Sequence, residues 1–295
     1  MKKGIRKSRG EITFACVNSL LLILLCFAIL YPMLMVIARS RMSDVERATH
    51  PLRIIPTDID LSGYRFILSS DAYVRHGYFI TIARTLIGTT LSLITTSMLA
   101  YPLSKRYYPG RKVITAMLVF TMWFGGGMIP TFIVIKTLKL IDTFWVLILP
   151  MMINVYNTII LRNFFMQIPD SLEESAKLDG GNDFQIFTLI YLPLSKAALA
   201  TISLFYAIWH WNQWFDALLY INKQSLWPLQ YILRQIITSA SAIDVSSAAA
   251  TFDAIPAMET VKMATIVIST LPILCVYPFL QKYFVKGVMV GSVKG

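Results

Sequence analysis

The sequence predicts an all-α integral membrane protein with six transmembrane helices. Hydrophobic residues make up 56% of its 295 positions and charged residues 15%, and the apolar residues gather in long runs. A soluble domain usually carries about a quarter charged residues. Because an uncharged stretch of about 18 or more residues is typical of a membrane helix, we expect one membrane domain that crosses the bilayer several times.

The first expected span is Phe14–Ala38. It is uncharged over about 25 residues, longer than the apolar core of a secretory signal, so we expect it to stay uncleaved. The other five spans are expected at Phe79–Leu103, Val113–Ile135, Phe144–Leu161, Ala197–Tyr220 and Met263–Tyr283. In the third span a glycine triplet, 125–127, precedes Pro130. This pattern is compatible with a kink near a gate or with close helix packing on small residues.

Lys and Arg cluster in the short segments between the spans. The positive-inside rule then places both termini on the cytoplasmic side. We expect a cytoplasmic amino terminus over 1–13, a transmembrane domain over 14–284 with an inside loop over 164–196, and a cytoplasmic tail over 285–295. The net charge of +11 therefore reflects membrane topology, and nucleic acid is not an expected partner. The three cysteines, Cys16, Cys26 and Cys275, lie within apolar runs and have no metal-ligand spacing.

The inside loop contains a helix–turn–helix pattern. Ser171 and Glu174 have the spacing of a capping box, so a helix can begin at Ser171. Gly180 and Gly181 can end it with a positive φ. Asn182 and Gln185 repeat the capping spacing for a second helix, and Pro193 marks the next boundary. By spacing alone, this segment is compatible with an ordinary interfacial connector or with a docking element for a soluble partner.

The same segment resembles the EAA motif of ATP-binding cassette importer permeases, which reads EAA-xx-DGA, then a variable stretch and a terminal LP. Here Glu174-Ser175-Ala176 is followed by Asp179-Gly180-Gly181 and later by Leu192-Pro193. Ser replaces the first Ala and Gly the last one, and both changes keep the side chains small. The resemblance implies that this segment is a coupling helix, with Glu173, Glu174, Ser175, Ala176, Asp179, Gly180 and Gly181 meeting an ATPase subunit.

The carboxy-terminal residues 279–295 are similar to the tail of MalG-type carbohydrate permeases, with the LplC/YtcP-like subgroup as the nearest pattern. The resemblance implies the type I importer permease fold in a bacterial inner membrane, and a tail that meets the ATPase through Lys286, Gly287, Gly291 and Lys294. It also implies a second homologous permease, two ATPase subunits that bind ATP and Mg, an extracytoplasmic sugar-binding protein and surrounding lipid. This chain itself is expected to hold no cofactor or metal and to catalyse no reaction. The expected cargo is an oligosaccharide, and whether it bears uronates stays open.

Two other functions compete with this interpretation. An ion-coupled secondary transporter or channel would need its own ion site or filter, and none is visible in the sequence. A membrane enzyme would need a nucleophile and a base, yet His50, His76 and His210 are scattered. No G-x-x-x-x-G-K-[ST] motif is present, so ATP hydrolysis is expected from another chain.

Three residues are candidates for a substrate pathway. Trp211 and Asn212 lie in the fifth span, and sugar sites combine aromatic faces with amides. Aromatic residues at a span end are also typical of an interfacial belt. Arg84, at the outer part of the second span, could attract an anionic sugar; alternatively it snorkels to the interface or pairs with a carboxylate.

Overall fold

The computed structural model describes residues 8–69, 73–246 and 259–275. In these ranges the regular elements are helices, apart from one isolated bridge between Met42 and Ile59. The chain divides into two compact units, which are described separately. The first comprises Met1–Ser70 and Ile236–Ile268, and the second Asp71–Gln235 and Ser269–Gly295.

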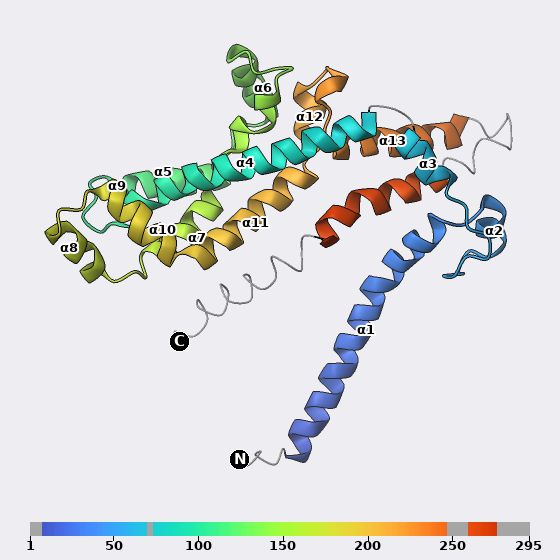
Figure 1. Cartoon of the computed structure of the whole chain (residues 1–295), viewed down its shortest axis with the longest axis horizontal. Coiled ribbons are helices and arrows are strands. Elements are labelled where there is room, and N and C mark those ends of the chain that lie inside the picture. The colour runs from blue at the N-terminus through green and yellow to red at the C-terminus, as the bar shows by residue number, and fades with distance from the viewer. Residues whose placement is uncertain (1–7, 70–72, 247–258, 276–295) are drawn as a thin grey trace. The chain divides into compact units, whose positions relative to one another are not determined.

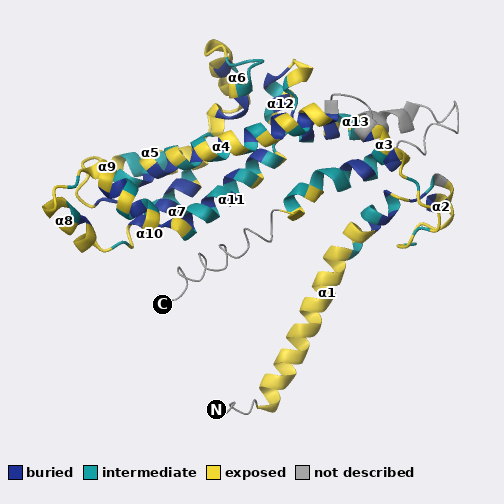
Figure 2. Ribbon diagram, in the orientation of Figure 1, coloured by how far each residue is buried: buried dark blue, intermediate teal, exposed yellow. Residues whose placement is uncertain are grey.

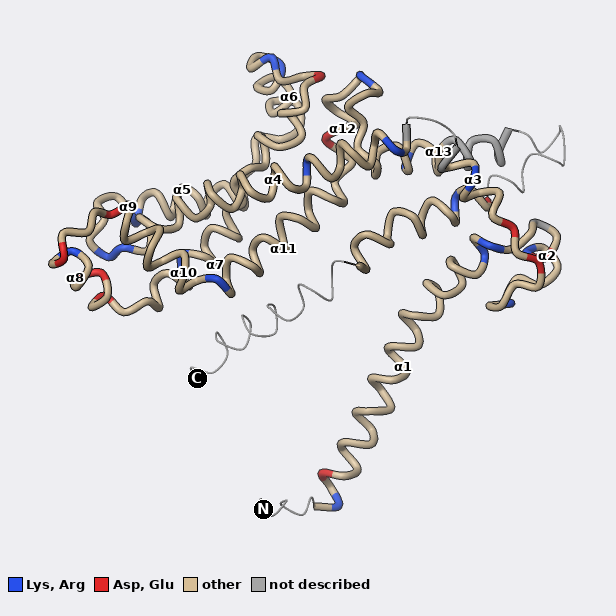
Figure 3. The backbone as a smooth tube through the Cα atoms, in the orientation of Figure 1, with Lys and Arg blue, Asp and Glu red and all other residues tan. Residues whose placement is uncertain are grey.

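The first unit begins with the long helix α1, Arg9–Arg39. Ser8 and Glu11 form a capping box at its start. At about 1.5 Å per residue, its 31 residues are long enough to cross a bilayer core of about 30 Å. Most of its apolar side chains are exposed (Figure 2), as expected of a helix whose neighbour is lipid. Figure 3 shows its charges gathered near the two ends.

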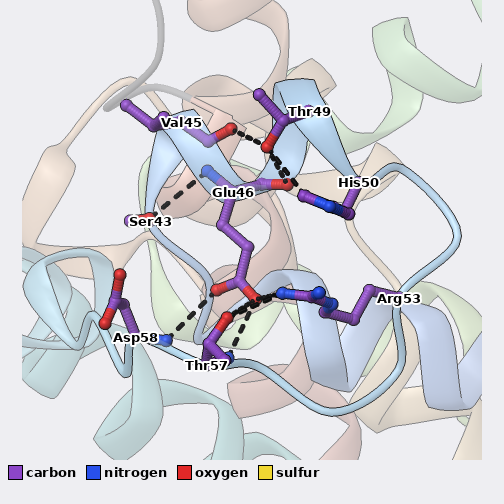
Figure 4. Close-up of polar contacts among 8 residues, drawn as sticks. All are labelled: Ser43, Val45, Glu46, Thr49, His50, Arg53, Thr57 and Asp58. Atoms are coloured by element: carbon purple, nitrogen blue, oxygen red, sulfur yellow. Dashed lines mark hydrogen bonds and ion pairs between the residues drawn. The ribbon is translucent and has the colours of Figure 1, made fainter.

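After α1 the chain folds into a compact segment with α2, Asp44–Thr49, and α3, Ser62–Ser69. Glu46 holds this segment together (Figure 4). Its buried carboxylate accepts hydrogen bonds from Arg53 at 3.0 Å, from the Thr57 hydroxyl at 2.6 Å and from the backbone N–H groups of Thr57 and Asp58 at 2.8 and 3.3 Å. One side chain thereby fixes a loop that has little other regular structure.

The second unit is built around α4, Tyr73–Ser104, which packs along α7, Val155–Phe165, and α11, Lys196–Asn212 (Figure 1). Buried side chains form two clusters. The first consists of Ala100, Leu161, Phe165, Ile186, Phe187, Tyr191, Ala198, Ile202 and Tyr206. The second consists of Ile80, Ile135, Val146, Leu147, Ala217, Tyr220, Ile221 and Tyr231.

The third expected span is not one continuous helix. It consists of α5, Arg111–Trp123, and α6, Met128–Thr137, which meet at an angle of 116°. Gly127 has φ +86°, a conformation that side chains disfavour. Pro130 then fits in the first turn of α6, where its missing N–H costs little. Of the two alternatives for the glycine triplet, the structure therefore has the break.

The fourth and fifth expected spans are also interrupted. The fourth starts as two 3₁₀ turns, Phe144–Leu147 and Leu149–Met151, which meet α7 at 53°. Asn154 caps α7. In the fifth expected span, α11 ends at Asn212 and the helix resumes as α12, Phe215–Tyr220. The chain continues through the 3₁₀ turn Gln224–Leu226 to α13, Leu229–Ser246, of which the residues up to Gln235 belong to the second unit.

By length and composition, two helices in the described residues can each cross a membrane alone, α1 and the main part of α4. Counting each bent pair as one span raises the number to as many as five. The expected sixth span begins within the helical residues 259–275, and its remainder lies outside the described residues. The fold is thus helical, and the count of six spans stays a prediction.

Candidate coupling site and substrate pathway

The expected coupling helix is α8, Asp170–Leu178. It begins one residue earlier than predicted, and the prediction of a capping box at Ser171 is wrong. Pro169 occupies the N-cap position with φ −60°, and no side chain caps the helix. Asp170 and Glu173 lie in the first turn, and Lys177 in the last. These charges suit the helix dipole, which favours acids at the start and bases at the end.

The turn after α8 depends on both glycines. The N–H of Gly181 donates to the carbonyl of Ala176 at 2.8 Å, and the N–H of Gly180 to that of Lys177 at 3.0 Å. This is the hydrogen-bond pattern of a Schellman motif. Gly180 has φ +82°, and a Cβ on Gly181 would lie 2.8 Å from the Ala176 oxygen. The positive φ expected for Gly180 is confirmed, while Gly181 is needed for close approach.

The second helix of the loop is α9, Asp183–Ile186, and Asn182 and Gln185 form the predicted capping box with two 2.9 Å hydrogen bonds. The boundary predicted at Pro193 is wrong. The chain continues as a π-helical segment, η3, Phe187–Tyr191, and as α10, Leu192–Leu194, before it breaks at Ser195. Pro193 falls at the second position of α10, where a helix tolerates a missing N–H.

Glu173 joins α8 to the rest of the second unit. Its carboxylate forms ion pairs with Lys105, next to the end of α4, and with Lys177 at 2.8 Å. It also accepts hydrogen bonds from the hydroxyls of Tyr107 at 2.7 Å and Tyr191 at 3.1 Å. The Lys105 ammonium lies 3.8 Å from the Tyr191 ring centroid. Three separate parts of the chain therefore meet at one carboxylate. We call this group, which consists of Glu173, Lys105, Tyr107, Lys177 and Tyr191, the Glu173 cluster.

The electrostatics of this cluster favour the ionised carboxylate. Burial by itself opposes ionisation of Glu173, but hydrogen bonds from Lys105, Lys177 and Tyr107 outweigh it and lower the pKa of Glu173 to about 2. Burial lowers the pKa of Lys105, against the opposing effect of Glu173. The hydrogen bond to Glu173 raises the pKa of Lys177. At neutral pH the carboxylate is charged.

Glu173 therefore differs from the other expected coupling residues. The resemblance to the EAA motif implies that Glu173 contacts an ATPase, but its side chain is 6% exposed and its oxygens are occupied within the chain. Ala176 is half-buried against the first cluster of the core. The exposed face of the loop consists of Glu174, Ser175, Asp179 and Gly180, together with Leu178 and Phe184, which are 89% and 72% exposed.

Arg84 lies at the point where the fifth span is broken. It is fully buried, and it forms an ion pair with Asp216 of α12. It also donates to the backbone oxygen of Gln213 at 3.1 Å and lies 5.7 Å from the Trp209 ring centroid. Of the alternatives that the sequence left open, the structure has the pair with a carboxylate. The candidate cation for an anionic sugar is thus already neutralised.

The other two pathway candidates occupy the end of α11. The Trp211 indole donates to the backbone oxygen of Ser269 at 3.4 Å, and Asn212 is exposed while its amide donates to the Ile208 carbonyl at 2.9 Å. These contacts leave the sugar-binding role a prediction. The candidates Lys286, Gly287, Gly291 and Lys294 lie outside the described residues.

The comparisons with known proteins give a consistent result. The family of the binding-protein-dependent transport system inner membrane component matches residues 88–290. Two relatives from Bacillus subtilis (strain 168) are each 47% identical. The polygalacturonan/rhamnogalacturonan transport system permease protein YtcP matches over 92% of this chain and 96% of its own. The protein LplC matches over 90% and 89%.

Among solved structures, a chain in the crystal structure of a bacterial ABC transporter involved in the import of the acidic polysaccharide alginate has a TM-score of 0.83 to this chain. The two are 37% identical, and the match covers 95% of this chain and 100% of the other. The resemblance seen in the motifs is therefore confirmed. This chain belongs to the family of binding-protein-dependent transport system inner membrane components.

Proposed function

We propose that this chain is a permease subunit of a carbohydrate importer and that its cargo is a uronate-containing oligosaccharide. The observation that carries this proposal is the similarity to two proteins: a polygalacturonan/rhamnogalacturonan transport system permease at 47% identity, and a chain of an ABC transporter involved in the import of the acidic polysaccharide alginate at 37%. Both matches cover at least 92% of this chain.

The working assembly contains two ATPase subunits, an external sugar-binding protein and a second homologous permease. Both termini of this chain face the cytoplasm, and ATP and Mg bind only to the ATPase subunits. When ATP closes the ATPase pair, each coupling helix moves with its subunit, and the permeases switch between inward- and outward-facing states. The exposed residues Glu174 and Ser175 of α8, and Asp179 directly after it, support this contact.

The Glu173 cluster supports a route for that movement. α8 is tied through Glu173 to Lys105 at the end of α4, and α4 runs along α7 and α11. A displacement of α8 that keeps these ion pairs must move the end of α4 as well. Glu173 is thus a positioning residue within this chain, and Glu174 is the contact with the ATPase.

An acidic cargo needs a cation other than Arg84, because Asp216 neutralises that side chain. Arg234 of α13 is the better candidate. It is exposed, its guanidinium carbon lies 3.8 Å from the Trp214 ring centroid, and it forms no ion pair with any residue that the structure describes. An arginine stacked on tryptophan offers both a charge and an aromatic edge to a uronate.

The test is a ligand screen of the cognate binding protein, followed by uptake in proteoliposomes that contain the whole complex. We expect acidic oligosaccharides such as oligogalacturonides to bind and to be imported only with ATP. A cognate ligand without carboxylates would contradict the proposed cargo. Uptake driven by an ion gradient without the ATPase subunits would contradict the importer itself and would favour a secondary transporter.

A further inference from the structure

A groove with an uneven distribution of charge runs along α5. Its volume is about 560 Å³, and it is lined by the α5 residues Arg111, Lys112, Thr115, Ala116, Val119, Phe120 and Trp123, by Phe124, and by Arg162 of α7. The cations stand at one end, where α5 begins, and the remaining lining is mainly apolar. We propose that this groove binds one anionic phospholipid from the leaflet on the side of α8.

The cationic end has charge without a counter-charge. Among the described residues, no Asp or Glu forms an ion pair with Arg111, Lys112 or Arg162. Arg111 donates to the carbonyl of Lys105 at 3.4 Å, and Arg162 to that of Leu103 at 3.0 Å. Each guanidinium has five N–H donors, so several stay available to a phosphate. Basic pockets between membrane helices are typical sites for anionic head groups.

The apolar wall has the length of one leaflet. From Arg111 to Trp123, α5 rises about 18 Å at 1.5 Å per residue, compared with about 15 Å for half of the hydrocarbon core. None of its residues is buried, and Phe120 and Trp123 are 58% and 80% exposed. At Phe124 the helix ends and the chain turns by 116° into α6. A phosphate at Arg111 therefore places an acyl chain along α5 as far as the break.

The cations lie at the same end of the second unit as α8. Lys105 and Arg111 flank the connection between α4 and α5, and Lys105 is the residue that pairs with Glu173. A lipid phosphate bound at Arg111 is thus close in sequence to the Glu173 cluster. Sugar is the poorer occupant because the groove offers hydroxyl groups few polar partners beyond its cationic end.

The experiment uses the complete transporter, purified in nanodiscs of phosphatidylcholine with increasing phosphatidylglycerol. Retained lipids are counted by native mass spectrometry. We expect wild type to retain one more phosphatidylglycerol than the double variant Arg111→Gln/Lys112→Gln, whose affinity should fall roughly tenfold or more. Lys196→Gln, which removes an exposed cation at the start of α11 outside the groove, should retain lipid as wild type does.

Two further variants separate lipid binding from misfolding. Ala116→Trp should block the groove and expel the lipid with all cations in place, whereas Lys112→Arg should keep the lipid. Equal retention by wild type, Ala116→Trp and the double variant would overturn the proposal. A disulfide between Trp123→Cys and a cysteine in the second permease would also overturn it, because a protein helix would then fill the groove. Neither result bears on the sugar that is transported.

Discussion

Arg84 of α4 and Asp216 of α12 form an ion pair across the point where α11 ends and α12 begins. They lie 132 positions apart in the sequence. The same guanidinium donates to the carbonyl of Gln213, one of the backbone groups that the helix end leaves without a partner. The Arg84 side chain thus pairs with the Asp216 carboxylate and also supplies a hydrogen-bond donor to the backbone carbonyl at the end of α11.

The first prediction concerns this pair. Arg84→Gln or Asp216→Asn should each destabilise the complex by about 3–5 kcal/mol, because each leaves a buried charge without its partner. The double variant should be less destabilised than either single variant. The measurement is thermal unfolding of the purified complex, with uptake of an acidic and a neutral sugar alongside. If Arg84→Gln unfolds like wild type and loses only the acidic sugar, Arg84 binds cargo after all.

The second prediction separates Glu173 from Glu174. Glu173→Gln should destabilise the permease by roughly 1–3 kcal/mol, since Lys105 is left buried and unpaired. It should also lower the sugar imported per ATP hydrolysed. Glu174→Gln changes an exposed side chain and should weaken ATPase docking without loss of thermal stability. Equal stability of the two variants would contradict the positioning role of Glu173.

The third prediction concerns the turn after α8. Gly180→Ala should cost about 1–2 kcal/mol, because it places a side chain at φ +82°. Gly181→Ala should shift the turn, because the Ala176 oxygen blocks its Cβ. Both should reduce import more than ATP turnover. Gly10→Ala, whose Cβ would meet only the Ser8 hydroxyl at 3.7 Å, is the control, and a similar loss in that variant would refute the argument.

The fourth prediction concerns pH. Hydrogen bonds from Thr57 lower the pKa of Glu46 from 4.5 to about 2. Because the folded pKa is depressed, the stabilisation is complete above about pH 4.5 and is lost only as the pH falls towards 2. Tryptic cleavage after Arg53 should therefore stay slow and constant from pH 8 to pH 6, a range in which Glu46 remains ionised. Each cleavage rate is normalised to the activity of trypsin itself at that pH.

Two variants check this expectation. Glu46→Gln should speed cleavage after Arg53 at every pH, because it removes the charge that orders the loop. Asp58→Asn should not, since Asp58 reaches Glu46 through its backbone N–H. A protection that declines between pH 8 and pH 6 in wild type would show that another group orders this segment.

Local patterns predicted much of the fold and of the coupling segment. The capping box at Asn182 and Gln185 and the positive φ of Gly180 follow from residues close in sequence, and the structure has both. The start of α8 was misjudged because Pro169 sets the entry to the helix ahead of Ser171. The glycine triplet of the third span left a kink open, whereas the hydropathy runs of the fourth and fifth spans give no sign of their interruptions, such as the one before the cap at Asn154.

Contacts between distant residues could not be predicted from such patterns. Glu173 meets Lys105 and Tyr107, which lie 68 and 66 positions away. In the sequence it is one of two adjacent glutamates, and only packing decides which of them is buried. The same holds for Arg84: the sequence left open whether it attracts an anionic sugar, snorkels to the interface or pairs with a carboxylate, and only the fold brings Asp216 to it.

The break between α5 and α6 has a consequence for how the protein is made. Gly125, Gly126 and Gly127 are exposed and donate no backbone hydrogen bond to any residue that the structure describes. Lipid tails cannot accept these bonds, and each unsatisfied group costs several kcal/mol in hydrocarbon. A newly inserted copy is therefore incomplete until another protein surface or a water-filled cavity meets this backbone. An orphan subunit should be the form that membrane proteases recognise, so its cellular lifetime should depend on how quickly it finds its partners.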